Sequence, residues 1–184
     1  MAKRLLDLVL AIGLLPLVVP LLAVAAIAVK LDSPGPAFFR QDRVGRDRKP
    51  FTMLKLRTMD RATRHAASHE IDALQITRVG RFLRRTKIDE LPQIFSVLAG
   101  DMSVVGPRPC LPVQDELIAE RERRGVYRAL PGITGPAQIA GIDMSTPALL
   151  AEVDARYVTE RTLGGDIALI VRTGLGGGAG DAVR

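Results

Sequence analysis

The stretch that organises this chain is Thr86-Lys87-Ile88-Asp89-Glu90-Leu91-Pro92-Gln93. Two carboxylates are adjacent in it, and an apolar stripe with helical spacing follows at Leu91, Ile94, Phe95 and Leu98. Pro92 is tolerated in a first helical turn, so a helix is expected to begin near Asp89, with Asp89 or Thr86 as its cap. The helix dipole favours an ionised carboxylate at that end.

Basic residues precede this pair, at Arg78, Arg81, Arg84, Arg85 and Lys87. An ionised Asp beside a second acid in basic surroundings suits phosphate chemistry with a divalent metal. The alternative is that Asp89 only caps a helix and Glu90 is only a first-turn acid. This stretch by itself favours that simpler interpretation.

The composition indicates anionic partners. The chain has 184 residues, enough for one domain with a membrane appendage, and its net charge is +6. Such a surplus suits lipid head groups, nucleotides or nucleic acid. Aromatic residues are scarce, with no Trp, two Tyr and five Phe, which counts against stacking on single-stranded nucleic acid. The single Cys110 excludes an internal disulfide and a cysteine-clustered zinc site, and the two histidines, His65 and His69, are interpreted as a solvated pair.

The N-terminal region predicts a membrane segment. Leu8 to Val29 carry no charge and no side-chain hydrogen-bonding group, and a straight helix of that length would reach roughly 33 Å. Pro16 and Pro20 interrupt the run, and basic residues flank both of its ends. Both facts favour a re-entrant helix with both ends on the cytoplasmic side. A plain kinked span and a cleaved signal peptide remain the alternatives.

The remaining chain predicts short strands and helices. Strands are expected at 37–41 and 51–57, around a turn centred on Gly45, and a loop or weak helix at 61–73. A basic amphipathic helix at 76–85 and a short strand before Gly106 follow. Further along the chain we expect a charged surface helix at 112–124, a helix with one apolar side at 147–159, a short apolar segment at 167–171 and a flexible tail at 174–180. The basic helix suits either an anionic membrane surface or solvent.

One loop presents a single arginine between two prolines, Pro107 and Pro109. Proline on both sides restricts Arg108 to extended geometry and lowers the entropy lost in presenting its guanidinium. A fixed fork of donors is suited to bidentate binding of phosphate.

Four motifs in this order carry a resemblance that covers the chain from Lys3 to about Val171: Lys55-Leu56-Arg57-Thr58-Met59, Asp89-Glu90-Leu91-Pro92-Gln93, Gly100-Asp101-Met102-Ser103-Val104-Val105-Gly106-Pro107-Arg108-Pro109 and Pro131-Gly132-Ile133-Thr134-Gly135. The chain resembles the monotopic phosphoglycosyl transferases, the bacterial sugar transferase family that starts glycan assembly on a polyprenol carrier. This resemblance reverses the simpler interpretation of Asp89.

The resemblance implies a mostly helical α/β fold. Residues 1–30 would form a re-entrant membrane helix kinked at Pro20, with Pro16 sharing the kink. Residues 31–173 would form a small catalytic lobe with amphipathic interfacial helices and short strands, and residues 174–184 a flexible tail. The lobe would lie on the cytoplasmic face of the bacterial inner membrane, in contact with membrane lipids.

The resemblance also implies a reaction. Asp89 would attack the β-phosphate of a UDP-sugar and release UMP, and undecaprenyl phosphate would then take the phosphosugar from the enzyme. Glu90 and Mg²⁺ would assist, with the metal on Asp89 and Glu90. Substrate binding is expected from Arg108 and Pro109, then from Lys55, Arg57, Arg84 and Gln138.

Some residues depart from the family pattern. Val19 stands where a Ser often precedes the kink proline, Pro136 where a Trp is usual, and Ile142 where a basic residue is usual. Several transferred sugars occur in such families, and a homodimer is one option for the assembly of this chain. The rival functions are a membrane-anchored module that binds anionic lipid or nucleic acid without catalysis, and an exported soluble protein. The transferase interpretation expects no nucleic-acid partner.

Overall fold

The structure, a computed structural model, describes residues 2–60 and 76–177. It is mostly helical, with one long apolar N-terminal helix and a few short strands, as the sequence predicted. The expected loop at 61–73, the His65/His69 pair and residues 178–184 of the tail lie outside the described residues. In chain order the elements are α1 (Ala2–Asp32), β1 (Phe38–Val44), η1 (Arg46–Arg48), β2 (Pro50–Leu56), α2 (Arg78–Thr86), η4 (Ile88–Glu90), α3 (Gln93–Ala99), β3 (Ser103–Val105), α4 (Asp115–Arg123), η5 (Val126–Arg128), β4 (Gly132–Thr134), α5 (Pro136–Ile139), α6 (Pro147–Glu160) and α7 (Leu163–Gly174).

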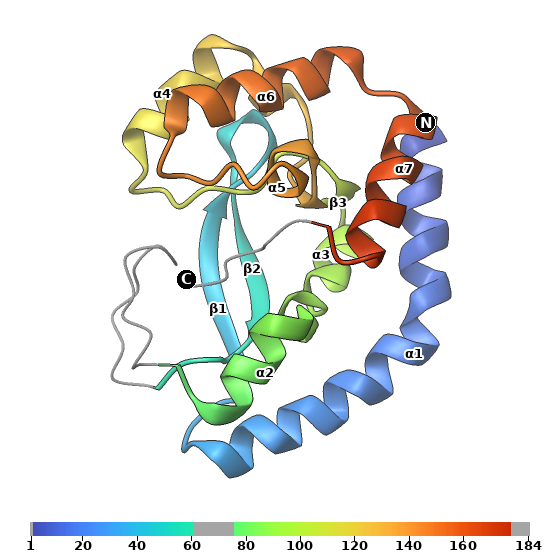
Figure 1. Ribbon diagram of the computed structural model, residues 1–184, viewed down its shortest axis with the longest axis vertical. Helices are drawn as coiled ribbons and strands as arrows, with labels where there is room; N and C mark the ends of the chain where they lie inside the picture. Colours follow the sequence, from blue (N-terminus) through green and yellow to red (C-terminus); the bar gives the residue numbers. More distant parts are fainter. Residues whose placement is uncertain (1, 61–75, 178–184) are drawn as a thin grey trace.

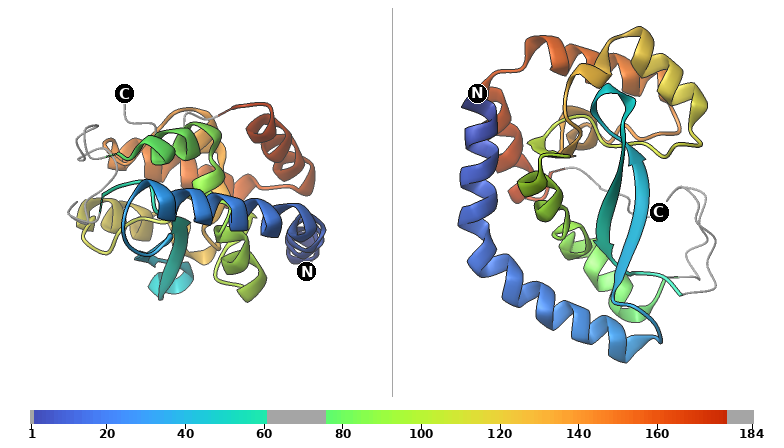
Figure 2. Two further views of the ribbon diagram at one scale, coloured as in Figure 1. Left: turned by 90° about the horizontal axis from the view of Figure 1, so that it is seen from below. Right: turned by 180° about the vertical axis from the view of Figure 1, so that it is seen from behind.

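The N-terminal run forms a single helix, α1, with Pro16 and Pro20 in its interior. The helix bends along its length and wraps one side of the molecule (Figures 1 and 2). Proline in a helix interior removes a backbone donor and is a common cause of such a bend. One face of α1 packs on the core through the buried residues Ala11, Val18, Leu22, Ala25 and Val29. Its other face is exposed and apolar, so α1 is long and apolar enough to cross a membrane by length and composition.

Polar contacts fasten the first turns of α1 to the rest of the protein. The carboxylate of Asp7, which is 2% exposed, accepts hydrogen bonds from Ser103 Oγ and from the backbone N–H of Val104, each at 2.9 Å. Arg4 donates to the backbone oxygens of Val97 and Leu98 at the end of α3. The N-terminal helix is therefore joined to β3 and α3 by charged side chains as well as by apolar packing.

The two expected strands form an antiparallel hairpin. Strands β1 and β2 pair from Phe38 with Leu56 to Val44 with Pro50. The turn between them contains the short helix η1, in which Asp47 and Arg48 have positive φ angles of 55° and 59°. The hairpin extends from the region of α2 to the group formed by α4, α5 and α6 (Figure 1).

The predicted cap of the central helix was wrong. Lys87 adopts a left-handed conformation that ends α2, and Ile88–Glu90 then form the 3₁₀ turn η4 before α3 begins at Gln93. Asp89 therefore lies in the 3₁₀ turn, and Thr86 donates its hydroxyl back to Phe82 and Leu83 of α2. The reason is Pro92. Because it has no N–H, it cannot make the backbone hydrogen bond that an α-helix beginning at Asp89 would need at this position. The α-helix α3 instead begins after Pro92, and no side chain forms a capping hydrogen bond there.

A second, parallel pair of strands was only half expected. Strand β3 was predicted, whereas its partner β4 was not among the expected strands. Ser103 pairs with Gly132 and Val105 with Thr134. Helix α4 was expected to be a charged surface helix, yet it buries Leu117 and Arg121 against α6. The short apolar segment at 167–171 lies within the longer helix α7.

Candidate active site

Asp89 and Glu90 are positioned by the 3₁₀ turn η4, which packs on both α2 and β2. The left-handed Lys87 turns the chain sharply between α2 and η4. Asp89 is buried, at 7% exposed, whereas Glu90 is half-buried. The pair therefore lies at a junction of three elements, where a short rigid turn presents two adjacent carboxylates.

Glu90 brings together two of the predicted cations. Its Oε1 atom accepts from Lys55 Nζ of β2 at 2.9 Å and from Arg108 Nη2 at 2.8 Å. All three side chains are at most 16% exposed. Partly buried ion pairs are screened less by salt than surface pairs, so Glu90, Lys55 and Arg108 form a coupled charge cluster.

The loop that carries Arg108 is set by the contact between β3 and β4. Gly106 donates its N–H to Thr134 O at 2.8 Å, and Gly132 donates to Pro107 O at 2.9 Å. The two backbones approach so closely that a Cβ atom on Gly132 would lie 2.0 Å from the nitrogen of Gly106. Glycine is required here because of close packing of backbone on backbone.

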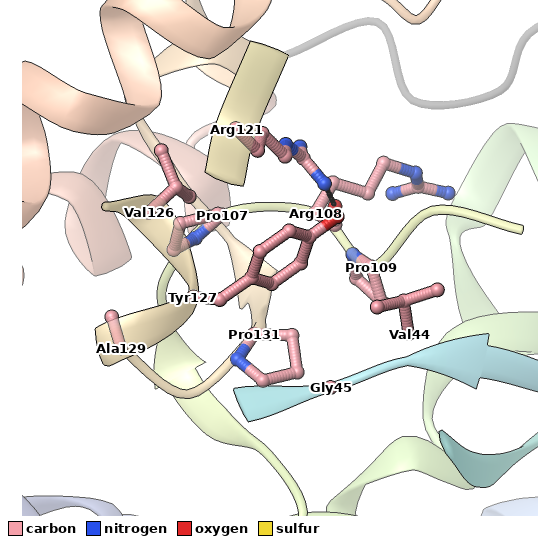
Figure 3. A pocket seen from close by; sticks show the side chains of 10 residues that line it. All are labelled: Val44, Gly45, Pro107, Arg108, Pro109, Arg121, Val126, Tyr127, Ala129 and Pro131. Carbon is pink, nitrogen blue, oxygen red and sulfur yellow. Dashed lines mark hydrogen bonds between the residues drawn. The ribbon is translucent and has the colours of Figure 1, made fainter. Parts of the chain in front are cut away.

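The pocket behind this loop is small and mainly lined by prolines and apolar groups (Figure 3). The ring of Tyr127 lies at its centre, and the Arg108 side chain extends away from the ring. Pro109 lines this pocket and accepts a hydrogen bond at its carbonyl oxygen from Arg43 Nη1 at 3.0 Å. Burial raises the pKa of Tyr127, whose hydroxyl lies 3.5 Å from Cys110 Sγ. The pocket supports the back of the Arg108 loop.

Three other predicted substrate-binding residues make contacts within the protein. Arg57, 7% exposed, donates to the carbonyl oxygens of Ser33 and Pro34 where the chain leaves α1. Arg84 Nε donates to Thr58 Oγ1 at 2.9 Å, and Gln138 Nε2 donates to Ile133 O at 2.7 Å. These contacts fix the side chains in place, and their role toward a substrate stays a prediction.

The residues present fit a magnesium ion by the chemistry of their donors. Mg²⁺ prefers carboxylate and phosphate oxygens and is commonly held by one or two carboxylates together with substrate phosphates and water. Asp89 and Glu90 supply two such carboxylates. Among residues 2–60 and 76–177 no cluster of three or more His, Cys, Asp or Glu side chains could hold a metal. A metal held by this pair would have coordination positions left for phosphate oxygens and water.

The structure also reveals buried polar groups that the sequence analysis did not single out. Asp166, 2% exposed, accepts from Lys3 Nζ at 2.7 Å and from Tyr157 Oη at 2.8 Å. Arg121 and Asp154 form a buried ion pair at 2.7 Å between α4 and α6. Burial and the hydrogen bond to Asp166 raise the pKa of Tyr157. Nothing in the sequence indicated that these charged residues are buried. Their burial depends on partners that come from other elements.

Comparison with known proteins places the chain in a family. The profile described as "Bacterial sugar transferase" matches residues 1–176. The chain belongs to the bacterial sugar transferase family. This membership and the long apolar helix α1 together indicate a membrane-associated protein.

Three relatives are named for closely related transfers. The chain is 43% identical to a UDP-glucose:undecaprenyl-phosphate glucose-1-phosphate transferase of Caulobacter vibrioides, over 93% of this chain and 67% of the relative. It is 41% identical to a protein of the same name from Escherichia coli, over 93% of this chain and 39% of the relative. It is 36% identical to a UDP-N-acetylgalactosamine-undecaprenyl-phosphate N-acetylgalactosaminephosphotransferase of Aeromonas hydrophila, over 93% and 42%. The chain thus spans two fifths to two thirds of these relatives' lengths.

Proposed function

We propose that this protein transfers a phosphosugar from a UDP-sugar to undecaprenyl phosphate and releases UMP. The observation that carries the proposal is the contact of Glu90, beside the buried Asp89, with both Lys55 and Arg108, in a chain of the bacterial sugar transferase family. Two carboxylates next to two cations are the groups that a transfer between phosphates requires. The names of the relatives supply the substrate classes.

The first step is a displacement at the β-phosphorus of the UDP-sugar. An oxygen of Asp89 forms a bond to this phosphorus, the bond from it to the oxygen bridging to the α-phosphate breaks, and UMP leaves with the electron pair. In the second step an oxygen of undecaprenyl phosphate attacks the same phosphorus and releases the Asp89 carboxylate. The products are UMP and a diphosphate-linked sugar on the lipid. Such a covalent intermediate divides one difficult transfer into two easier ones.

A carboxylate that attacks a diphosphate meets charge repulsion, so cations must offset the phosphate charge. Arg108 is suited to hold the diphosphate because its guanidinium can bind two phosphate oxygens at once. Lys55 adds a compact positive charge on the same side of Glu90. Mg²⁺ bound at Asp89 and Glu90 would supply further neutralisation of the phosphate oxygens.

The apolar N-terminal helix suits a lipid substrate. The exposed face of α1 carries large apolar residues from Leu5 to Leu31. The helix is bent (Figure 1) and has two prolines in its interior, which is compatible with a re-entrant segment in one leaflet. In that arrangement the catalytic lobe lies on the cytoplasmic face of the bacterial inner membrane. The site is then at head-group level, where the phosphate of the carrier lies, and the lipid tail stays in the bilayer.

The names of the relatives indicate which UDP-sugars to test as donors. The Caulobacter and Escherichia proteins are named for glucose 1-phosphate and the Aeromonas protein for N-acetylgalactosamine phosphate. We therefore propose UDP-glucose as the first donor to test and UDP-N-acetylgalactosamine as the second.

The test is release of UMP by the detergent-purified protein, with undecaprenyl phosphate, Mg²⁺ and a panel of UDP-sugars. A donor labelled in its β-phosphate reports the covalent intermediate as label retained on denatured protein when the lipid is left out. The expected result is metal-dependent UMP release from one donor, with both release and label abolished by Asp89→Asn. The matched control is Asp101→Asn, which changes an exposed carboxylate on the surface.

Two results would contradict the proposal. UMP release undiminished by Asp89→Asn would remove Asp89 as the nucleophile. Absence of UMP with every donor, from protein shown to be folded, would count against the transferase itself and favour a binding module. A module that binds anionic lipid through its surface charge would also retain its activity in Asp89→Asn.

A further inference from the structure

The carbonyl oxygens of the loop that presents Arg108 hold it to other elements of the protein. Pro107 and Pro109 have no N–H to donate, so the backbone of this segment offers few donors. Four consecutive carbonyl oxygens each accept a hydrogen bond from another element, at 2.8 to 3.0 Å. Pro107 O accepts from Gly132 N, Arg108 O from Arg121 Nη1, Pro109 O from Arg43 Nη1, and Cys110 O from Val44 N.

Arg121 is the more buried of the two arginine donors. Its side chain comes from α4 and is 1% exposed. Its Nε and Nη2 atoms donate to Asp154 Oδ2 of α6 at 3.0 and 2.7 Å, and its Nη1 atom donates to Arg108 O at 2.8 Å. Figure 3 shows its guanidinium beside the backbone of Arg108, on the side away from Pro131. A planar fork of donors lets one side chain hold both the carboxylate and the carbonyl.

The ion pair by itself explains little. A buried ion pair loses solvation, and its replacement by apolar residues is often neutral for stability. Burial raises the pKa of the Asp154 carboxyl, and the neighbouring Arg121 opposes that shift. Arg121 thus offsets part of the effect that burial has on Asp154. The arrangement makes Arg121 rigid and aims its remaining donor at the Arg108 loop.

We propose that Arg121, held by Asp154, is a positioning residue that fixes the direction of the Arg108 side chain toward Glu90. The carbonyl of Arg108 belongs to the same peptide plane as the nitrogen of Pro109, so a hydrogen bond to that oxygen sets the ψ angle of Arg108. The following proline restricts the same residue to extended geometry. Together the two constraints determine where the guanidinium can reach, and it reaches Glu90 Oε1 at 2.8 Å.

The inference rests on the proposed function in one respect, that Arg108 binds the diphosphate of the donor. If it does, loss of positioning weakens the binding of the donor more than it slows the reaction of the bound donor. The test variant is Arg121→Lys, which keeps the positive charge but replaces the separate guanidinium nitrogens that hold Asp154 and the Arg108 carbonyl by one ammonium nitrogen. The matched control is Arg123→Lys on the same helix, where the side chain is 68% exposed.

The expected result is a KM for the UDP-sugar that is about tenfold higher in Arg121→Lys, with kcat little changed. A residue that only stabilised the fold would lower the amount of active enzyme and leave KM unchanged. In an Arg108→Ala background, Arg121→Lys should have no further effect on KM, because its effect passes through Arg108. Effects that multiply, or an unchanged KM in folded Arg121→Lys, would overturn the proposal.

A second measurement does not depend on catalysis. Hydrogen exchange of the amides in residues 105–111 should be faster in Arg121→Lys than in the wild type and unchanged in Arg123→Lys. Unchanged exchange in this segment would overturn the proposal, even if the wild type released no UMP and the proposed function had failed. Where Arg121→Lys does not fold, Asp154→Asn takes its place, because it leaves Arg121 present but without its anion.

Discussion

Nη2 of Arg108 lies 2.8 Å from Oε1 of Glu90, and Nζ of Lys55 lies 2.9 Å from the same oxygen. One carboxylate oxygen thus holds two cations that are 35 and 18 residues away in the chain. Glu90, the residue after Asp89 in the chain, therefore holds both cations in place through contacts within the protein. Pre-ordered charges of this kind need no rearrangement when the phosphate charge is redistributed during transfer.

Glu90→Gln tests this arrangement. The amide keeps the size of the side chain but removes the negative charge that orders the two cations, so kcat for UMP release should fall by about 10² to 10³. Initial rates measured at saturating donor report the change, and Glu116→Gln, on the exposed face of α4, is the control. A kcat within twofold of the wild type would show that Glu90 has no part in catalysis.

Asp7→Ala tests the attachment of the N-terminal helix. The change leaves the Ser103 hydroxyl and the Val104 N–H without their shared acceptor in a buried position, which should cost about 1–3 kcal/mol. The midpoint of thermal denaturation in detergent should fall, and Asp101→Ala, which alters an exposed carboxylate, should leave it unchanged. Equal midpoints for the two variants would contradict a stabilising role of Asp7.

Gly132→Ala tests the contact between β3 and β4. The new Cβ atom would lie 2.0 Å from Gly106 N, so the two strands must separate and the Arg108 loop must move. Lower thermal stability and a higher KM for the donor are expected together. Gly164→Ala is the control, because a Cβ atom there meets nothing within 4 Å. Wild-type stability in Gly132→Ala would mean that the strands lie further apart than described.

The two tyrosines provide a test of burial by titration. The chain contains only Tyr127 and Tyr157, and burial raises the pKa of both above the usual 10.0. The folded state therefore keeps protons above pH 10 that the unfolded state loses, so the free energy of unfolding should decrease as the pH rises through this range. Phenolate absorbance of the folded protein should appear well above pH 10, and near 10 in denaturant.

Tyr157→Phe provides the matched comparison for this titration. It removes one phenol and should reduce the loss of stability above pH 10, while Tyr127 accounts for the remainder. The variant also takes a donor from Asp166 and from the backbone oxygen of Val105. Phenolate formation near pH 10 in the folded wild type would contradict the burial of both rings.

Local patterns explain why much of the fold could be predicted. The strands of the hairpin and helices α2 and α6 are encoded by alternation, by helical spacing and by turn residues near them in the sequence. The errors arose where contacts between residues distant in the sequence decide whether a segment forms a strand or is buried. Strand β4 has only three residues and exists because β3 pairs with it, and α4 reads as solvated although Arg121 is buried against Asp154.

The candidate site divides in the same way. The motifs of the sequence indicated four of the site residues: Asp89, Glu90, Arg108 and Lys55. The order of these motifs indicated the family. That Lys55 and Arg108 meet at one oxygen of Glu90, while Arg57 is turned to the carbonyl oxygens of Ser33 and Pro34, was decided only by tertiary structure. The sequence by itself determined which charged residues are present, the apolar length of α1 and the rigid loop around Arg108. The partners of each charge depend on how separate elements pack, because a hydrogen bond joins atoms that are close in space, wherever they stand in the chain.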